Sequence, residues 1–290
     1  VVYNTNLISK NFFKFMKKYL SPLIKNSFKT IFKSYILSKK VYVDIEYINL
    51  KILKNCSLGQ KNEIIILPID NIILPSILKT GAWESHIIKL LKKYSKKRIF
   101  IFLDIGANIG LISRQVINSK INISKVFCFE PDKEKIKLIR HNLSKYKNIK
   151  IMNYGLGKKD INLKLYKNIY NFGDTSFIKK ISNFSKAKVK NINNFFIKNL
   201  SQSKLPIIYK SDTQGMDEEI ILSLKETFLK NIEILIIEIN NNKAILKNIN
   251  KFNKIIKFFS KFYIHNQRVS KKNVLNKIKS RNEFDLIMVK

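Results

Sequence analysis

Two glycines, Gly106 and Gly110, and an acidic residue, Glu130, follow apolar segments at spacings that suit a small anionic or nucleoside ligand. An apolar run, Ile99–Leu103, is followed by the turn DIGANIG at residues 104–110. Glycine fits where the backbone must approach a ligand closely or adopt positive φ. A helix that begins after Gly110 would direct free N–H groups at the turn, where they can meet a negatively charged group. The stretch therefore predicts a strand, a ligand-binding turn and a helix.

A second apolar segment, Val126–Phe129, ends in Glu130. An acidic residue at the tip of the second strand, about 20 residues past a glycine turn, is placed to accept hydrogen bonds from ribose hydroxyls. The turn itself has the pattern GxxxG, with Asn108 where a pyrophosphate-binding loop would carry its middle glycine. This pattern favours a nucleoside ligand without a pyrophosphate, and the two features together predict a nucleoside-binding corner.

Asp212 is the best candidate for a catalytic residue. It follows the apolar segment Pro206–Tyr209, at the predicted tip of a central strand. As a carboxylate it could accept a proton from a substrate hydroxyl or orient that hydroxyl. It could instead cap the next helix through its side chain.

Other polar residues near predicted strand ends are weaker candidates. Asn153 could form a structural turn or contact a cofactor, since it lies at the carboxyl end of a central strand. Asp104 could be a turn former and Glu130 a surface charge, rather than ligand contacts. Glu84 could cap a helix or contact a substrate or cofactor, and Asp174 lies on a loop that could border the site. For His265 a packed or surface position is the simpler interpretation.

The elements that would position these residues alternate from Arg98 onward between strand and helix. The predicted strands are Ile99–Leu103, Val126–Phe129, Ile149–Tyr154, Pro206–Tyr209 and Ile232–Ile239; the predicted helices are Leu111–Ser119, Lys133–Tyr146, Asp217–Leu229 and Ile245–Phe259. Connections of this length allow right-handed crossovers between parallel strands. Phe262–His265 and Phe284–Val289 are expected to form a terminal antiparallel pair, because the linker 266–282 shows no helical pattern strong enough for another crossover.

Residues 161–200 interrupt this alternation. Leu163–Tyr166 and Val189–Phe196 look like strands, and a polar loop at 171–177 lies between them. An insertion over the strand ends would be suited to shaping a substrate site.

Residues 1–80 are expected to form an extension, ahead of a main domain at 81–290. Residues 1–40 combine apolar and Lys positions at roughly helical spacing, which predicts a helical cap, an oligomer contact or an amphipathic helix on an anionic membrane surface. Residues 41–80 predict a small antiparallel layer with strands at 41–43, 47–53 and 64–67, and a helix is predicted at Ser85–Tyr94.

The net charge of +36 would usually suggest a nucleic-acid or membrane partner, but only five of the 56 basic residues are Arg. Phosphate and base recognition favour Arg, so we do not expect a nucleic-acid partner. Cys56 and Cys128 show no metal-ligand spacing, and no metal site is expected. No apolar run reaches the ~18 residues of a membrane span. We expect a cytoplasmic protein in which residues 1–40 could contact a membrane surface.

Four segments resemble the FkbM-type methyltransferases, from about Gly81 to the C-terminus: FLDIGANIG, CFEPD, MNYGLG and, most clearly, KSDTQGMDEEIIL. The closing segment EFDLIMV agrees, whereas Ser211 stands where the family often has Ile or Val. The resemblance implies a Rossmann-like class I methyltransferase sheet with helices on both faces. It also implies methyl transfer from S-adenosylmethionine, usually to an oxygen of a sugar, glycan or other small acceptor.

By this resemblance the turn would hold the methionine half of the cofactor and Glu130 its ribose. The candidate cofactor contacts are Asp104, Gly106, Ala107, Asn108, Gly110, Glu130 and Asn153. Two other functions are considered: an RNA methyltransferase, favoured by charge alone, and a non-catalytic protein that binds polyanions or membranes. The acceptor and the oligomeric state are left open.

Overall fold

The structure is a computed structural model that describes residues 47–70, 72–167, 172–178, 183–240, 242–280 and 283–290. The predicted basic segment 1–40 and the strand at 41–43 lie outside these residues. In the part of the chain that the structure describes, no helix is long and apolar enough to cross a membrane.

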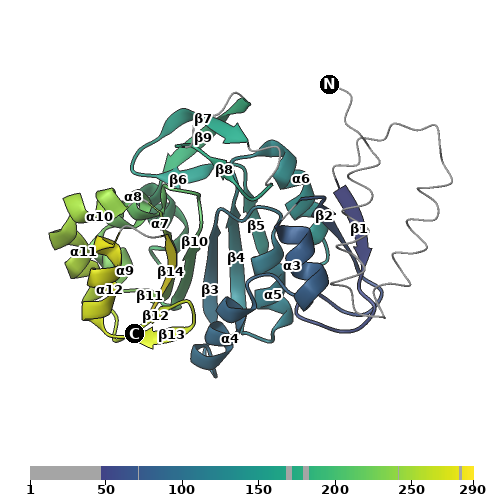
Figure 1. The fold of residues 1–290 in the computed structure, drawn as a ribbon, viewed down its shortest axis with the longest axis horizontal. Helices are drawn as coiled ribbons and strands as arrows, with labels where there is room; N and C mark the ends of the chain where they lie inside the picture. The colour runs from purple at the N-terminus through teal and green to yellow at the C-terminus, as the bar shows by residue number, and fades with distance from the viewer. Residues whose placement is uncertain (1–46, 71, 168–171, 179–182, 241, 281–282) are drawn as a thin grey trace.

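The main sheet has eight strands among the described residues, in the order β13-β12-β14-β11-β10-β3-β4-β5 (Figure 1). Its strands are β3 Phe100–Ile105, β4 Ile123–Phe129, β5 Ile149–Met152, β10 Ile207–Ser211, β11 Ile232–Ile239, β12 Lys261–Ile264, β13 Gln267–Val269 and β14 Phe284–Val289. Strands β5, β4, β3, β10 and β11 run parallel, and β14 is antiparallel to both β11 and β12. This is the Rossmann-like sheet with a terminal antiparallel pair that the sequence predicted.

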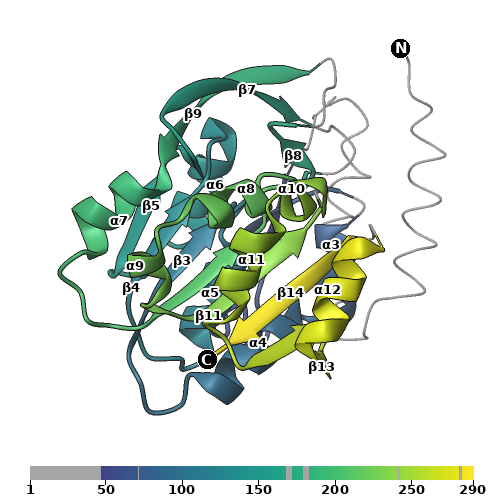
Figure 2. The same cartoon turned by 90° about the vertical axis from the view of Figure 1, so that its left-hand side faces the viewer.

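Helices cover both faces of this sheet (Figures 1 and 2). One face carries α4 Ser85–Tyr94, α5 Leu111–Asn118 and α6 Lys133–Asn142; the other carries α7 Ile192–Leu200, α8 Asp217–Ser223, α9 Glu226–Leu229, α10 Asn242–Lys247, α11 Ile249–Ile256 and α12 Lys271–Lys279. Strand β3 shows why both faces are needed: Phe100 and Phe102 pack under the first group, and Ile101 and Leu103 under the second. A strand with apolar side chains on both of its faces must be buried on both sides.

A second sheet, in the order β6-β9-β7-β8, lies beyond the main one (Figure 1). Its strands are β6 Gly155–Gly157, β7 Ile161–Lys167, β8 Thr175–Ser176 and β9 Phe184–Asn191. The predicted strand at 189–196 was wrong beyond Asn191. The Asn191 side chain accepts hydrogen bonds from the N–H groups of Asn193 and Asn194, and this cap starts α7.

The expectation that 266–282 lacks a helix was also wrong, since β13 and α12 occupy most of it. Ser270 caps α12 by accepting a hydrogen bond from Asn273, and Val274 and Ile278 supply its buried face. A buried pair four residues apart is a weak signal among so many lysines.

The N-terminal part described by the structure is a hairpin of β1 Tyr47–Lys51 and β2 Ile64–Pro68, followed by α3 Ile73–Thr80. The antiparallel pairing was predicted, and α3 was not. The side chain of Asn142, at the end of α6, links β2 to the turn that follows β3. Its Oδ1 accepts a hydrogen bond from the N–H of Ile66 at 2.8 Å, and its Nδ2 donates to the carbonyls of Ile66 and Ile109, each at 3.0 Å. The domain boundary at residue 80 stays a prediction.

Candidate active site

A cavity of about 200 Å³ lies at the carboxyl ends of β3, β4, β10 and β11, and β6, β7 and β8 supply its other wall. Strand order reverses between β3 and β10, and open α/β sheets bind ligands at such a switch point. The predicted residues that line it are Glu84, Gly106, Ala107, Asn108, Glu130, Asp174 and Asp212. The chain thus gathers acidic and glycine residues from separate strand ends into one place.

Gly106 lies where the ends of β3 and β10 come close together. Its φ is +75°, and a Cβ built on it would lie 1.9 Å from the carbonyl oxygen of Asp212. The N–H groups of Gly106 and Ala107 both donate to the carbonyl of Phe129 at 3.0 Å. The turn is therefore fixed between β4 and β10, and only glycine fits at its first position.

Glu130 reaches the same turn from β4. Its carboxylate accepts hydrogen bonds from the backbone N–H groups of Asn108, at 3.0 Å, and Asp132, at 2.9 Å. Burial raises its pKa to about 7, against the opposing effect of Lys135 and of these N–H groups. Each carboxylate oxygen can accept more than one hydrogen bond, so Glu130 keeps acceptor capacity toward the cavity.

Three predicted contacts do not line the cavity. Asp104 lies beneath the turn, where it accepts a hydrogen bond from Ser113 Oγ at 2.6 Å, and burial raises its pKa. Gly110, at φ +81°, begins α5, and a Cβ there would press on Leu143. The amide of Asn153 donates to the carbonyls of Glu130 and Pro131 at 3.1 and 3.3 Å. These residues are placed to support the turn and the tip of β4, which for Asn153 favours the structural alternative.

Asp212 sits on the opposite side of the turn, with 28% of its side chain exposed. Its Oδ2 is 3.4 Å from Lys210 Nζ, and its Oδ1 accepts a hydrogen bond from Gln214 Nε2 at 3.0 Å. Burial alone would raise the pKa of Asp212, but Lys210, Gln214 and Glu238 outweigh burial and lower it. The carboxylate is therefore ionised over the whole neutral range.

The alternative role of Asp212 as a helix cap does not match the structure. No side chain caps α8 from its N-cap residue, Met216. The neighbouring backbone N–H of Thr213 instead donates to the carboxylate of Asp217 at 3.0 Å, and Ser211 Oγ donates to the same carboxylate. Asp217 thus accepts the local hydrogen bonds of this turn, whereas Asp212 lines the cavity.

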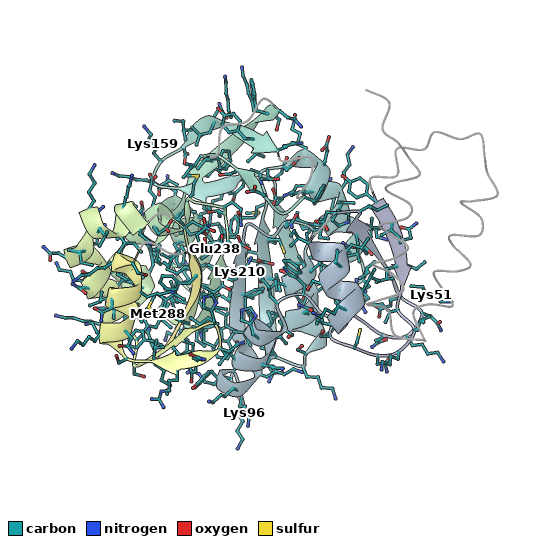
Figure 3. All side chains as sticks on the ribbon, in the orientation of Figure 1. Lys51, Lys96, Lys159, Lys210, Glu238 and Met288 are labelled. Carbon is teal, nitrogen blue, oxygen red and sulfur yellow. The ribbon has the colours of Figure 1, made fainter. Side chains whose placement is uncertain are left out.

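Glu238, on β11, is the second carboxyl group of this end of the cavity (Figure 3). Gln214 Nε2 bridges the two acids, since it also donates to Glu238 Oε2 at 3.1 Å. Burial, together with the charges of Asp212 and Asp217, raises the pKa of Glu238 to about 9. At neutral pH Glu238 therefore keeps its proton and can donate a hydrogen bond to Asp212, so the pair carries one charge.

This retained proton predicts a pH-dependent effect of Glu238→Gln on stability. The pKa of Glu238 rises from 4.5 to about 9 on folding, so the folded protein holds a proton that the unfolded chain loses. The associated stabilisation is complete below the unfolded pKa and is lost as pH rises through the folded one. We expect the melting temperature of the wild type, relative to Glu238→Gln, to fall between about pH 5 and pH 9 in thermal unfolding. A difference independent of pH would contradict this.

Among the cavity residues that the sequence did not single out are Lys135, Lys210, Gln214 and Glu238. Lys210 is buried against Asp104 and Asp212; burial alone would lower its pKa, but the surrounding carboxylates raise it. Burial lowers the pKa of Lys135, near Glu130. Nothing in a lysine-rich sequence marks these two as buried, whereas the position of Glu238 at a strand tip was a usable signal. His265 is exposed in the turn between β12 and β13.

No family model matches the sequence, and a search of curated proteins finds no match. Among solved structures the chain is similar to the methyltransferase FkbM from Methylobacillus flagellatus KT, with 12% identity, a TM-score of 0.41 and coverage of 74% of this chain and 52% of that one. The chain thus spans about half the length of that protein.

Two further similarities are of the same order. Precorrin-6y C5,15-methyltransferase from Geobacter metallireducens GS-15 gives 14% identity, a TM-score of 0.37 and coverage of 73% and 91%. An rRNA methylase from Streptococcus thermophilus gives 15%, 0.37, 71% and 93%. Similarity at this level identifies neither a family nor a substrate.

Proposed function

We propose that the protein is an S-adenosylmethionine-dependent methyltransferase that methylates a hydroxyl group of a sugar, glycan or other small acceptor. The observation that carries the proposal is the cavity at the switch point of the sheet, with the turn of Gly106 on one strand end and the carboxyl of Glu130 on the next. This combination suits a nucleoside without a pyrophosphate.

The residues present fit such a cofactor. The site of Gly106 leaves no room for a Cβ, so the turn offers bare backbone at the cavity wall. Among the described residues Asn108 Oδ1 is buried and has no hydrogen-bond partner, although it borders the cavity. Glu130 would accept hydrogen bonds from the ribose hydroxyls, and the turn 106–108 would lie against the sulfur end of the cofactor. When bound, S-adenosylmethionine supplies a methyl group on a positively charged sulfur.

Asp212 would take the proton that an acceptor hydroxyl loses. It is held ionised by Lys210 and oriented by Gln214. A carboxylate of lowered pKa is a weak base, so Asp212 would first align the hydroxyl by hydrogen bonding and would take its proton as the oxygen bonds to the methyl carbon and becomes acidic. Alignment supplies much of the rate when the leaving group is already activated.

The charges at the acceptor end bear on the acceptor class. Asp212 and Glu238 line the end of the cavity where the acceptor would bind, and a phosphate group would meet the ionised carboxylate of Asp212 there. These acids favour an uncharged hydroxyl acceptor, whereas RNA is supported only by the net charge of +36. Transfer of a labelled methyl group, measured with neutral glycans and with total RNA as alternative acceptors, separates the two. Labelling of RNA alone would overturn the hydroxyl-acceptor proposal.

Glu130→Ala is expected to weaken binding of S-adenosylmethionine. A hydrogen bond to a charged group contributes about 1.5–3 kcal/mol, so we expect a loss of at least ~10-fold in affinity. Isothermal titration measures it, with Glu134→Ala on the exposed side of α6 as the control. Unchanged affinity in Glu130→Ala would remove its role at the ribose.

A further inference from the structure

Glu84 is half-buried, and one of its carboxyl oxygens is buried without a structural role in the fold. It precedes α4, but its side chain makes no capping hydrogen bond. Within the described residues its Oε2 atom is inaccessible to solvent and has no hydrogen-bond partner. The residue lines the cavity beside Trp83.

The position of Glu84 is costly in two ways. Its backbone adopts φ +44° and ψ +48°, a left-handed conformation that is unfavourable for any residue with a Cβ. Burial of a carboxylate without a partner is also unfavourable. Neither cost is offset by a cap, and such costs persist at sites where a ligand completes the interactions.

The basic side chains near Glu84 lie closer to other carboxylates. Lys210 Nζ lies 3.4 Å from Asp212 and 3.8 Å from Asp104. His86 Nε2 lies 3.4 Å from Asp285. The partner that Glu84 lacks is therefore a positively charged hydrogen-bond donor from outside the chain.

Glu84 and Glu130 face the cavity from opposite sides of the β3 turn. Glu84 interacts electrostatically with Lys210 and Asp212 on the β10 side, and Glu130 with Lys135 on the β4 side. Strands β10 and β4 are the two neighbours of β3. A ligand whose ribose meets Glu130 and which crosses the turn would bring its other end to Glu84.

We propose that Glu84 binds the α-ammonium group of the amino-acid end of S-adenosylmethionine. The inference rests on the proposed function, which supplies the ligand. It adds the residue that binds the ammonium group of that ligand. The ammonium would donate to Oε2, which satisfies the buried atom and places a positive charge within a group of acids.

The test compares two ligands that differ only in this ammonium: S-adenosylhomocysteine and its deamino analogue, which keeps the carboxylate. Their affinities for the wild type and for Glu84→Gln are measured by isothermal titration, with competition for the weaker ligand. Glu219→Gln, at an exposed position of α8, is the matched control. We expect Glu84→Gln to weaken S-adenosylhomocysteine about 10- to 100-fold and to leave the analogue unchanged.

Thermal unfolding without ligand supplies a second measurement. Because burial disfavours the carboxylate of Glu84 in the free protein and its Oε2 atom has no hydrogen-bond partner there, Glu84→Gln is expected to leave the melting temperature unchanged or raise it. Equal weakening of both ligands, unchanged affinity for both, or a melting temperature lowered by several degrees would each overturn the inference. A wild type that binds neither ligand would instead remove the proposed function.

Discussion

Gly106→Ala is expected to abolish cofactor binding and to destabilise the protein by about 2–4 kcal/mol, from overpacking and backbone strain together. The new methyl group would meet the carbonyl oxygen of Asp212 at 1.9 Å, which is far inside contact distance. That carbonyl belongs to a strand end fixed by the hydrogen bond from Asp212 N–H to the carbonyl of Ile105 at 2.9 Å. Relief of the clash must therefore separate β3 from β10 at the cavity.

Gly81→Ala provides the matched control. Gly81 has nearly the same φ, +73°, against +75° for Gly106, but a Cβ there would have nothing within 4 Å. Gly81→Ala should be destabilised only by the conformational cost, about 1 kcal/mol, and should keep full cofactor affinity. Denaturant unfolding and isothermal titration measure both variants. Equal destabilisation of the two would contradict the close approach at Gly106.

Asp212→Asn is expected to retain cofactor binding and to lower kcat by about 10²- to 10⁴-fold. The amide cannot take a proton from the acceptor, and it removes the charge that Lys210 holds in place at 3.4 Å. Cofactor contacts assigned to the turn and to Glu130 do not involve this side chain. Single-turnover kinetics with the labelled cofactor and titration of S-adenosylhomocysteine separate the two effects.

The same substitution changes the neighbouring acid, so a second variant is needed. The charge of Asp212 helps to raise the pKa of Glu238, and without it Glu238 would ionise more readily. Residual turnover in Asp212→Asn should therefore disappear in the double variant with Glu238→Gln. Normal turnover in Asp212→Asn would dismiss Asp212 as the base.

The parallel strands could be predicted because each is a short apolar run between turn residues, and the length of the connections then predicts their parallel direction. The segments at 192–196 and 266–282 were misassigned for a different reason. Helix α7 depends on one capping residue, Asn191, that follows a strand directly, and α12 buries only Val274 and Ile278. In both segments most residues are polar, so the helical spacing of apolar residues is weak, and the helix forms because its few apolar side chains pack against the rest of the protein.

For the site, spacing predicted the residues at strand ends, because parallel strands bring their carboxyl ends to one edge. Gly106, Glu130 and Asp212 do meet there. Spacing could not show that Asp104 lies below the turn, or that Lys210 joins it to Asp212. Such pairings depend on which side chains face each other across neighbouring strands. The unpartnered oxygen of Glu84 is likewise visible only in three dimensions.

Isothermal titration of the wild-type protein with S-adenosylmethionine shows whether this cavity binds the methyl donor. We expect saturable binding of one cofactor per chain, which Gly106→Ala abolishes and Glu130→Ala weakens. A folded wild-type protein that shows no binding, with Asp104 and Glu130 intact, would contradict the claim that this cavity is a methyl-donor site.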